Sequence, residues 1–530
     1  MVRMRGKLSV LVLVALGGCG GGEDSATTPP SNTPPTNTPT APAIGYTAGV
    51  FPASSTFAAQ CATPRTGTDP STSKPYPDTA GSTLAEKHFL RSWSNELYLW
   101  FNEITDRDPA SVSLVAEYFN LLKTNAVLAS GAPKDQFHFT YDSASYYALS
   151  QSGTSLGYGI SWNLVQSVPP RRLVVQYVQA GSQAAAQGVT RGAELQTVDG
   201  VSVVSDNTQS GLETIGKGAF EPAAGSTHTL VFKARNGTQF TTELAAANVT
   251  FSAVPVVKVL PSATGNLGYL LFNDHTAASE QALVTAVNQL KSGNVQDLIL
   301  DLRYNGGGYL AIASELAYMI AGPAATSGKT FEPLQFNSKY PSTDPVTGQA
   351  LTPMPFLSST AFSSTAVALP SLNLSRVYVL TSDDTCSASE SLINGLRGIG
   401  MQVLQIGGNT CGKPYGFYPR DNCGTTYFSI QFRGVNAVGF GDYAAGFSST
   451  RTTGEPQANL PGCSARDDFT RDLGDVQEER LRVAIEYRAT GACTGTLSSV
   501  EPQASASSGD SGLPLHIPAE PWRQNRFLRP

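Results

Sequence analysis

The sequence predicts a multidomain α/β protein. Its 530 residues exceed one ordinary domain, and 41% of them are hydrophobic, which is enough for well-packed cores. From about residue 265, apolar runs of strand length alternate with helical spacing, as through Leu283, Val287 and Leu290. The predicted strands are 268–272, 297–303, 377–380 and 403–406. Because this alternation is typical of parallel strands joined by helices, we expect an α/β core over residues 249–494.

The region before the core is predicted to be helical. Phe89, Trp93 and Trp100 recur at helical spacing within residues 84–104. We therefore expect a mostly helical N-terminal domain over residues 45–149. His88 lies in the same stretch, and we interpret it as an ordinary helix residue rather than a catalyst.

Residues 150–248 are predicted to form a β-rich domain, with a strand at 173–178 and a short helix at 182–187. The segment GVTRGAEL at 188–195, followed by Val198-Asp199-Gly200, resembles the core motif of PDZ domains. The resemblance implies a carboxylate-binding loop, whose backbone N–H groups and following strand edge bind the C-terminus of a polypeptide. The residues of this loop are Gly157, Tyr158, Gly159 and Ile160. The alternative is a β domain that serves only for packing.

The N-terminus carries a targeting pattern. Basic residues precede a short apolar run at 8–16, which is too short to span a bilayer, so residues 1–18 read as a signal peptide. The small residues before Cys19 resemble the lipobox of bacterial lipoproteins. That resemblance implies a lipid anchor on Cys19 and, with Gly20 next, the periplasmic face of the outer membrane. An ordinary cleaved signal with an incidental cysteine is the alternative.

The remaining composition sets further expectations. Residues 19–44 are rich in Pro and Thr and predict an extended tether, and the Ser/Gly/Pro-rich residues 495–530 predict a disordered tail. A net charge of −6 gives no basic footprint for nucleic acid.

Export implies an oxidising compartment, where six cysteines can form three disulfides of open connectivity. These cysteines are Cys61, Cys386, Cys411, Cys423, Cys463 and Cys493. Their spacing is not that of a zinc site, so we expect no metal.

Three stretches carry candidate chemistry. In DDTCSASESLINGL at 383–396, Ser387 and Glu390 have the spacing of a capping box, so Ser387 is either a helix cap or a nucleophile. DLRYNGGG at 301–308 follows a strand and is either a tight turn or an oxyanion hole. Lys413 lies among glycines and aromatic residues, and is either a surface lysine or a desolvated amine that serves as a base.

A serine–lysine dyad explains these stretches economically. No histidine is close in sequence to residues 383–396, and no GxSxG motif is present, although a histidine triad can still assemble in space. Together the three stretches resemble the tail-specific, or C-terminal processing, proteases of serine peptidase family S41. Their motifs are DLRxNxGG, a nucleophilic serine in S-A-S-E, and a lysine in T-x-G-K.

The resemblance implies a role for each matching residue. Ser387 attacks the peptide carbonyl and Lys413 takes its proton. The N–H groups of Ala388 and Gly307 form the oxyanion hole, with Gly306 as the near alternative, and Glu390 supports the helix start. The resemblance also implies a protease core of the crotonase/ClpP-like type that needs no cofactor. Its partners would be polypeptides bound by their C-termini.

Two departures from the family pattern stand out. Phe417 occupies a position where relatives often carry a glutamine that orients the lysine, and residues 395–398 lack an aspartate found in many of them. We further hypothesise that disulfides brace the site, with Cys411–Cys423 as a candidate pair. Other functions remain open: an inactive peptide- or ligand-binding lipoprotein on the same fold, or a Ser–Lys esterase or amidase acting on small substrates.

Overall fold

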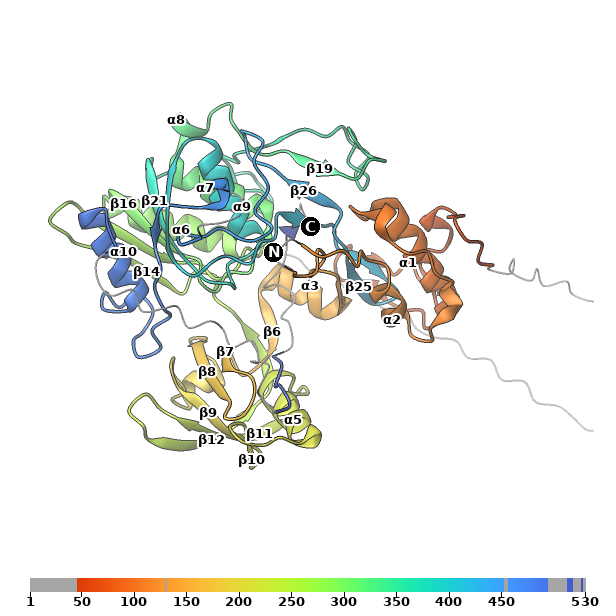
Figure 1. Ribbon diagram of the computed structural model, residues 1–530, viewed down its shortest axis with the longest axis horizontal. Helices are drawn as coiled ribbons and strands as arrows, with labels where there is room; N and C mark the ends of the chain where they lie inside the picture. The colour runs from red at the N-terminus through yellow and green to blue at the C-terminus, as the bar shows by residue number, and fades with distance from the viewer. Residues whose placement is uncertain (1–44, 129–130, 452–455, 494–511, 518–525, 528–530) are drawn as a thin grey trace, which may run out of the picture. The chain divides into compact units, whose positions relative to one another are not determined.

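The computed structural model describes residues 45–128, 131–451, 456–493, 512–517 and 526–527. The predicted signal peptide (1–18), the tether (19–44) and Cys19 lie outside the described residues. The predicted α/β class is confirmed (Figure 1). Among the described residues, no helix combines the length and apolar character needed to cross a bilayer.

The core is a six-stranded sheet in the order β14-β15-β16-β21-β22-β27. β14 pairs antiparallel with β15, and all the other neighbours are parallel. The strands are β14 (Val256–Leu260), β15 (Leu267–Leu271), β16 (Asp297–Asp301), β21 (Arg376–Thr381), β22 (Gln402–Gly407) and β27 (Gly462–Cys463). The side chains of β15, β16, β21 and β22 are almost all buried, because helices cover both faces of a parallel sheet, whereas those of the edge strand β14 are half-buried or exposed.

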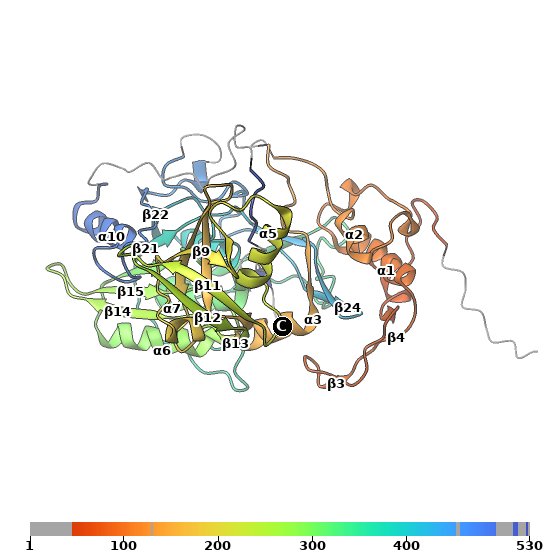
Figure 2. The same ribbon diagram turned by 90° about the horizontal axis from the view of Figure 1, so that it is seen from below.

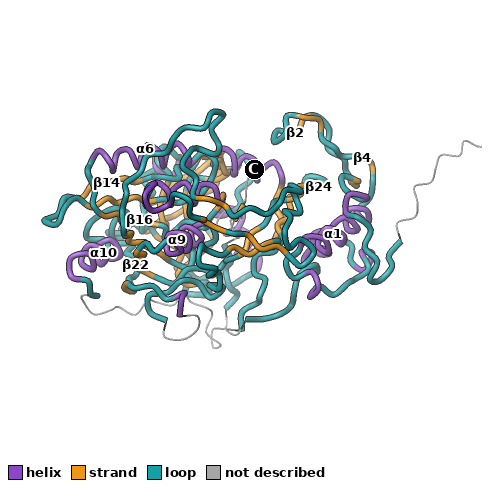
Figure 3. Tube along the Cα trace, turned by 90° about the horizontal axis from the view of Figure 1, so that it is seen from above, coloured by secondary structure: helices purple, strands orange, loops and turns teal. Residues whose placement is uncertain are grey.

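Helices pack on the two faces of this sheet (Figures 1 and 3). One face carries α6 (Ser279–Ser292), α7 (Leu310–Ala321) and α9 (Ala388–Gly398). The other face carries α10 (Glu479–Thr490), whose Leu481 and Ala484 are fully buried. The predicted helix through Leu283 and Leu290 is α6, and these two side chains lie in the core as their spacing requires.

The N-terminal region is less helical than predicted. It holds α1 (Thr83–Leu97), α2 (Val115–Asn120) and α3 (Ser143–Ser152), joined by loops and short strands. α1 ends at Leu97, so Trp100 is not on it, because the buried Tyr98 leaves helical geometry and its hydroxyl donates to Asp135. His88 lies on α1, as expected, and is buried there rather than at or near the surface. β5 (Phe139–Asp142) pairs with β25 (Thr425–Phe428), so this region shares a sheet with residues far along the chain.

A second sheet, which we call the β module, has its own apolar core (Figure 2). Its order is β12-β11-β9-β8-β7, and β10 pairs with β9. The strands are β7 (Ile160–Gln166), β8 (Arg172–Val178), β9 (Glu194–Val198), β10 (Val201–Ser202), β11 (Thr227–Lys233) and β12 (Gln239–Ala245), with helices α4 (Gln183–Ala186) and α5 (Gln209–Ile215). β6 (Thr154–Gly157) and β13 (Ala247–Thr250) pair where the chain enters and leaves the module.

The remaining elements are short. They are β1 (Gln60–Cys61), β2 (Thr68–Asp69), β3 (Lys74–Pro75), β4 (Thr79–Ala80), β17 (Gly308–Tyr309), α8 (Pro323–Thr326), β18 (Thr330–Glu332), β19 (Leu334–Phe336), β20 (Met354–Pro355), β23 (Tyr415–Gly416), β24 (Arg420–Asn422), β26 (Phe432–Gly434) and β28 (Arg526–Phe527), together with the turns of helix at 54–56, 101–103, 109–111, 216–220 and 456–458.

The prediction of a disordered tail is wrong for part of residues 495–530. Leu515 is only 3% exposed and belongs to the core of the β module, and β28 pairs with β17. The reason is local: the run Leu-Pro-Leu-His-Ile at 513–517 is an apolar island in an otherwise polar tail. Residues 494–511, 518–525 and 528–530 lie outside the described residues.

Candidate active site

The three candidate stretches meet at one edge of the core sheet. The loop at 301–308 follows β16, the stretch at 383–396 follows β21, and Lys413 comes after β22. These strands are consecutive neighbours and parallel, so their carboxyl ends lie at the same edge. Active sites form at this edge of an open α/β sheet because the loops that follow the strands converge there.

Ser387 has an unusual backbone conformation. Its φ is +62° and its ψ is −112°, a region that residues other than glycine rarely adopt. Its N–H donates to the Glu390 carboxylate at 2.9 Å, which is one half of the predicted capping box. The hydroxyl is fully buried and has no hydrogen-bond partner among the described residues, so no histidine engages it. This conformation leaves the hydroxyl free of capping.

Glu390 does more than support the start of α9. One carboxylate oxygen accepts from the backbone N–H of both Ser387 and Lys413, at 2.9 and 2.8 Å. The other oxygen accepts from Thr410 Oγ1 at 2.6 Å and from Gly412 N–H at 2.8 Å. Burial raises the pKa of Glu390, and these four hydrogen bonds oppose that rise. A single buried carboxylate therefore fixes the two candidate catalytic segments to each other.

A disulfide joins the same two segments. Cys386 and Cys411 are bonded, with their Cα atoms 5.2 Å apart. The predicted Cys411–Cys423 pair is therefore wrong: Cys423 bonds to Cys61, and Cys463 bonds to Cys493. Sequence alone could not choose among fifteen connectivities. Although the two sulfurs lie close to the Glu390 carboxylate, they are bonded to each other, so they do not form a thiolate metal site.

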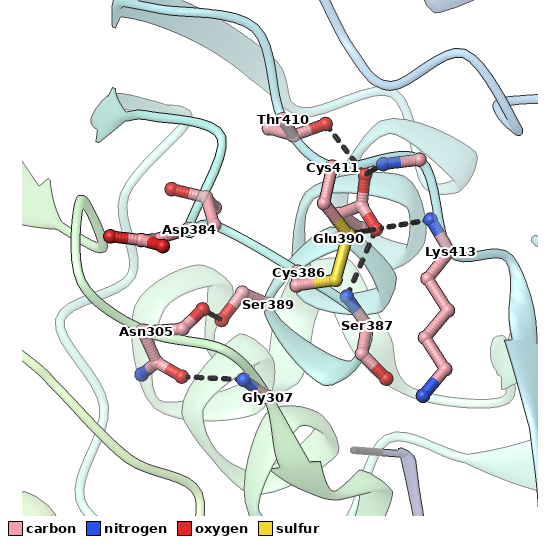
Figure 4. Close-up of a disulfide and its surroundings, with 12 residues drawn as sticks. Asn305, Gly307, Asp384, Cys386, Ser387, Ser389, Glu390, Thr410, Cys411 and Lys413 are labelled. Atoms are coloured by element: carbon pink, nitrogen blue, oxygen red, sulfur yellow. Dashed lines mark hydrogen bonds between the residues drawn. A yellow bond between two sulfur atoms is a disulfide. The ribbon is translucent and has the colours of Figure 1, made fainter. Parts of the chain in front are cut away.

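Lys413 is fully buried against aromatic rings. Its Nζ lies 4.7 Å from the ring centroid of Phe137 and 4.3 Å from that of Phe417. The Phe417 that departs from the family pattern thus presents its ring to the amine. Figure 4 shows the Ser387 hydroxyl and the Lys413 amine extending in the same direction, away from the Glu390 carboxylate.

Asn305 organises the glycine loop, and sequence reasoning did not single it out. Its backbone carbonyl accepts from Cys386 N–H at 3.1 Å and from Ser389 Oγ at 3.0 Å. Its side-chain oxygen accepts from Gly307 N–H at 3.0 Å (Figure 4). The same oxygen bonds Nδ1 of His275 at 2.9 Å. Burial lowers the pKa of His275 to about 4. The sequence did contain a signal for Asn305, because it is a polar residue in the loop that follows the buried strand β16.

These bonds decide between the candidate oxyanion donors. The Gly307 N–H is already engaged by Asn305, which argues against the first choice made from the sequence. The N–H groups of Gly306 and Ala388 donate to no group in the part of the chain that the structure describes. The arrangement therefore favours Ala388 with Gly306.

A buried ionic network lies behind the loop. Arg303 is fully buried and pairs with Asp301 at 2.8 Å and with Glu478 at 2.6 Å. Its neighbour Tyr304 donates to Asp467, and Arg191 of the β module donates to the Tyr304 hydroxyl at 2.6 Å. The attraction between the basic and acidic groups offsets the free-energy cost of removing their charges from water. The network connects the β module to the residues just before the glycine loop.

The predicted peptide-binding loop lies in the β module, not among the catalytic candidates. Gly157, Tyr158, Gly159 and Ile160 run from the end of β6 into β7 and line a cavity of about 500 Å³. The N–H groups of Tyr158 and Gly159 donate to no group among the described residues. β7 is the terminal strand of its sheet, so one of its edges is open.

Comparison with known proteins agrees with this geometry. Residues 266–416 match peptidase family S41. A carboxyl-terminal-processing protease from a Picosynechococcus strain is 26% identical over 266 residues, which are 50% of this chain and 56% of that protein. The chain thus spans little more than half the length of that relative. A solved structure from Bacteroides fragilis, assigned to the S41 proteases, is 22% identical, has a TM-score of 0.56, and is matched over 79% of this chain and 98% of its own, which establishes a shared fold.

Proposed function

We propose that this chain, whose residues 266–416 place it in peptidase family S41, is a serine endopeptidase with Ser387 as nucleophile and Lys413 as base. The observation that carries the proposal is the shared Glu390 oxygen, which accepts from the N–H groups of both residues. Their side chains extend in the same direction from that clamp (Figure 4). A buried amine beside an uncapped hydroxyl is the arrangement that a serine–lysine dyad requires.

The reaction follows from these positions. The neutral Lys413 amine takes the hydroxyl proton as Ser387 Oγ attacks the substrate carbonyl carbon. The N–H groups of Ala388 and Gly306 receive the oxyanion, and the N-terminus of α9 adds the positive end of its dipole. The protonated amine then gives its proton to the leaving nitrogen as the C–N bond breaks. Water, deprotonated by the same lysine, hydrolyses the acyl-enzyme and frees Ser387.

The β module is proposed to recruit substrates as a PDZ-like domain. Support comes from the open edge of β7 and from the unengaged N–H groups of Tyr158 and Gly159, which suit an extended peptide and its terminal carboxylate. The substrates would then be polypeptides held by their C-termini, the class that the Picosynechococcus relative's name indicates for that protein.

The proposed location is the bacterial cell envelope, with Cys19 as the lipid anchor at the periplasmic face of the outer membrane. Three disulfides among the described residues support an oxidising compartment. Labelling with a radioactive fatty acid, in the wild type and in Cys19→Ala, tests the anchor directly.

Cleavage of an unstructured protein such as casein tests the enzymatic proposal. We expect the wild type to cut it, and Ser387→Ala and Lys413→Met to lose activity by at least about a thousandfold. Ser391→Ala removes another hydroxyl of α9 and is the matched control, which should remain active. Equal cleavage by all four proteins would exclude the dyad. Peptide binding without cleavage by the wild type would instead favour an inactive binding lipoprotein.

A further inference from the structure

A segment of the same chain contacts the β module beside the end of β7. Residues 513–517 lie between the end of β7 and the start of α5. Leu513 N–H donates to Asn207 Oδ1 at 2.6 Å, and Leu513 C=O accepts from Arg171 Nη2 at 2.6 Å. Leu515 N–H donates to the carbonyl of Ser167, just after β7, at 2.8 Å.

The segment alternates as a bound strand does. Leu515 is buried in the core of the module, and Ile517 is half-buried against it. Pro514, which precedes Leu515, and His516, which lies between Leu515 and Ile517, are exposed. Alternate side chains of an extended peptide point in opposite directions, so two of them enter the module and two face solvent.

The direction of the segment is that of a recruited C-terminus. Leu513 lies at the far end of β7, whereas Ile517 lines the same 500 Å³ cavity as Tyr158 and Gly159 at the beginning of β7. The segment therefore runs antiparallel to β7, with its C-terminal side toward the carboxylate-binding loop. Ile517 is followed by Pro518, so the segment carries a peptide carbonyl and not a free carboxylate at this end, and the N–H groups of Tyr158 and Gly159 donate to no group among the described residues.

The other end of this tail lies at the catalytic loop. β28 pairs in parallel with β17, where Gly308 follows the oxyanion candidates, and it also lies beside β23, just after Lys413. Ser387 and Lys413 are themselves fully buried. The tail thus contacts both the recruitment groove and the segments that hold the dyad.

We propose that residues 513–517 are an internal ligand of the β module, which substrate C-termini must displace. The inference rests on the proposed recruitment role and specifies its selectivity: an extended terminus with an apolar last residue and a second apolar residue two positions earlier. A free carboxylate gains the N–H groups of Tyr158 and Gly159, which the internal ligand leaves unused. Displacement at the groove also loosens the tail at the catalytic loop.

Peptide binding to the full-length chain in a Ser387→Ala background tests this without turnover. The probe is a fluorescent peptide, Leu-Pro-Leu-His-Ile, with either a free or an amidated C-terminus. We expect Leu515→Asp/Ile517→Asp, which ejects the internal ligand, to bind the free acid about tenfold more tightly than the parent. Pro514→Asp/His516→Asp, which places two aspartates on the exposed side, is the control and should match the parent. The amidated peptide should bind at least about tenfold more weakly.

A milder variant covers the case in which two aspartates unfold the module. Asn207→Ala removes only the acceptor for Leu513 N–H, and should raise affinity by about threefold. Equal affinity in the parent and both tail-weakening variants, or no binding by any of them, would overturn the inference. With Ser387 intact, the aspartate double variant should also cleave casein faster. If binding behaves as expected but no protein cleaves casein, the proposed enzymatic function fails while the internal ligand stands.

Discussion

Phe417 presents its ring to Lys413, with 4.3 Å between the ring centroid and Nζ. Many relatives are expected to carry a glutamine at this position. An aromatic face attracts a cation through its quadrupole and contributes about 0.5–2 kcal/mol. It therefore favours the protonated amine, which opposes the effect of burial. In this chain two aromatic rings, those of Phe137 and Phe417, lie against the amine.

Replacing Phe417 by leucine removes the ring and keeps an apolar side chain. We expect the acid limb of the pH–rate profile for kcat/KM to move to lower pH, because the protonated form loses its aromatic partner. The control is Phe139→Leu, since the Phe139 ring packs on Phe417 with centroids 6.1 Å apart. It should lower stability without moving the limb. An unmoved limb in Phe417→Leu would show that the ring only fills space.

Glu390→Gln tests the clamp between the two segments. A glutamine amide accepts through one oxygen only, so its NH₂ group would face N–H donors that the carboxylate now satisfies. We expect kcat to fall by at least about tenfold while KM stays within about twofold, because geometry changes at the reacting groups and not in the β module. A second readout is the rate at which a fluorophosphonate labels Ser387, which should fall in parallel.

The matched control for the clamp is Glu86→Gln. Glu86 is also a buried carboxylate, and it accepts a backbone N–H from Ala62 at 2.8 Å, but it lies on α1. It should lose stability while the labelling rate remains normal. If Glu390→Gln labels at the wild-type rate, the carboxylate does not position the nucleophile.

Patterning and motif spacing predicted much of the core and of the site. The expected strand at 377–380 is β21, and parallel pairing of β16, β21 and β22 is what gathers the three motifs at one edge. Such information is local, because alternation and glycine runs can be read within about ten residues. The candidate site could therefore be located before any contact was known.

Features that depend on distant contacts could not be predicted. The end of α1 at Leu97 follows from Tyr98 reaching Asp135, which is 37 residues away in the sequence. The bond from Gly307 N–H to Asn305 is local, but it depends on the orientation of a buried side chain, which the sequence does not give. The tail was expected to be disordered because its average composition is polar. Two apolar side chains, Leu515 and Ile517, are too few to change that average. They are nevertheless enough to hold this part of the tail in place, because they pack against the core of the β module.

The Cys386–Cys411 disulfide should matter for rate as well as for stability. Its loop closes 25 residues, and the Cys463–Cys493 loop closes 30, so each contributes about 3.5 kcal/mol to stability by chain entropy. We expect the two Cys→Ala double variants to lose similar stability in urea unfolding. Only Cys386→Ala/Cys411→Ala should also lose kcat, by about tenfold, because it loosens Ser387 relative to Lys413. Equal kcat in the two variants would assign the bond to stability alone.

A buried carboxyl pair away from the site predicts how stability depends on pH. Glu280 accepts from the backbone N–H groups of Ala361 and Phe362, at 2.6 and 2.8 Å. Glu315 is fully buried beside it, and its second oxygen has no hydrogen-bond partner among the described residues. Burial, and then the Glu280 charge, raise the pKa of Glu315 to about 9. The folded protein therefore holds a proton on Glu315 at neutral pH.

Unfolding returns Glu315 to its ordinary pKa of about 4.5 and releases that proton. The folded state binds the extra proton between these two values, so this group's stabilisation is complete below about pH 4.5 and is lost as pH rises toward about 9, at up to about 1.4 kcal/mol per pH unit. Glu315→Gln has no proton to lose. Measured by urea unfolding at pH 5.5, 6.5 and 7.5, its stability relative to the wild type should rise by about 1 kcal/mol per pH unit. Glu213→Gln, at an exposed position on α5, is the control and should show no such trend. A constant difference between Glu315→Gln and the wild type across this range would mean that Glu315 is ionised in the folded protein.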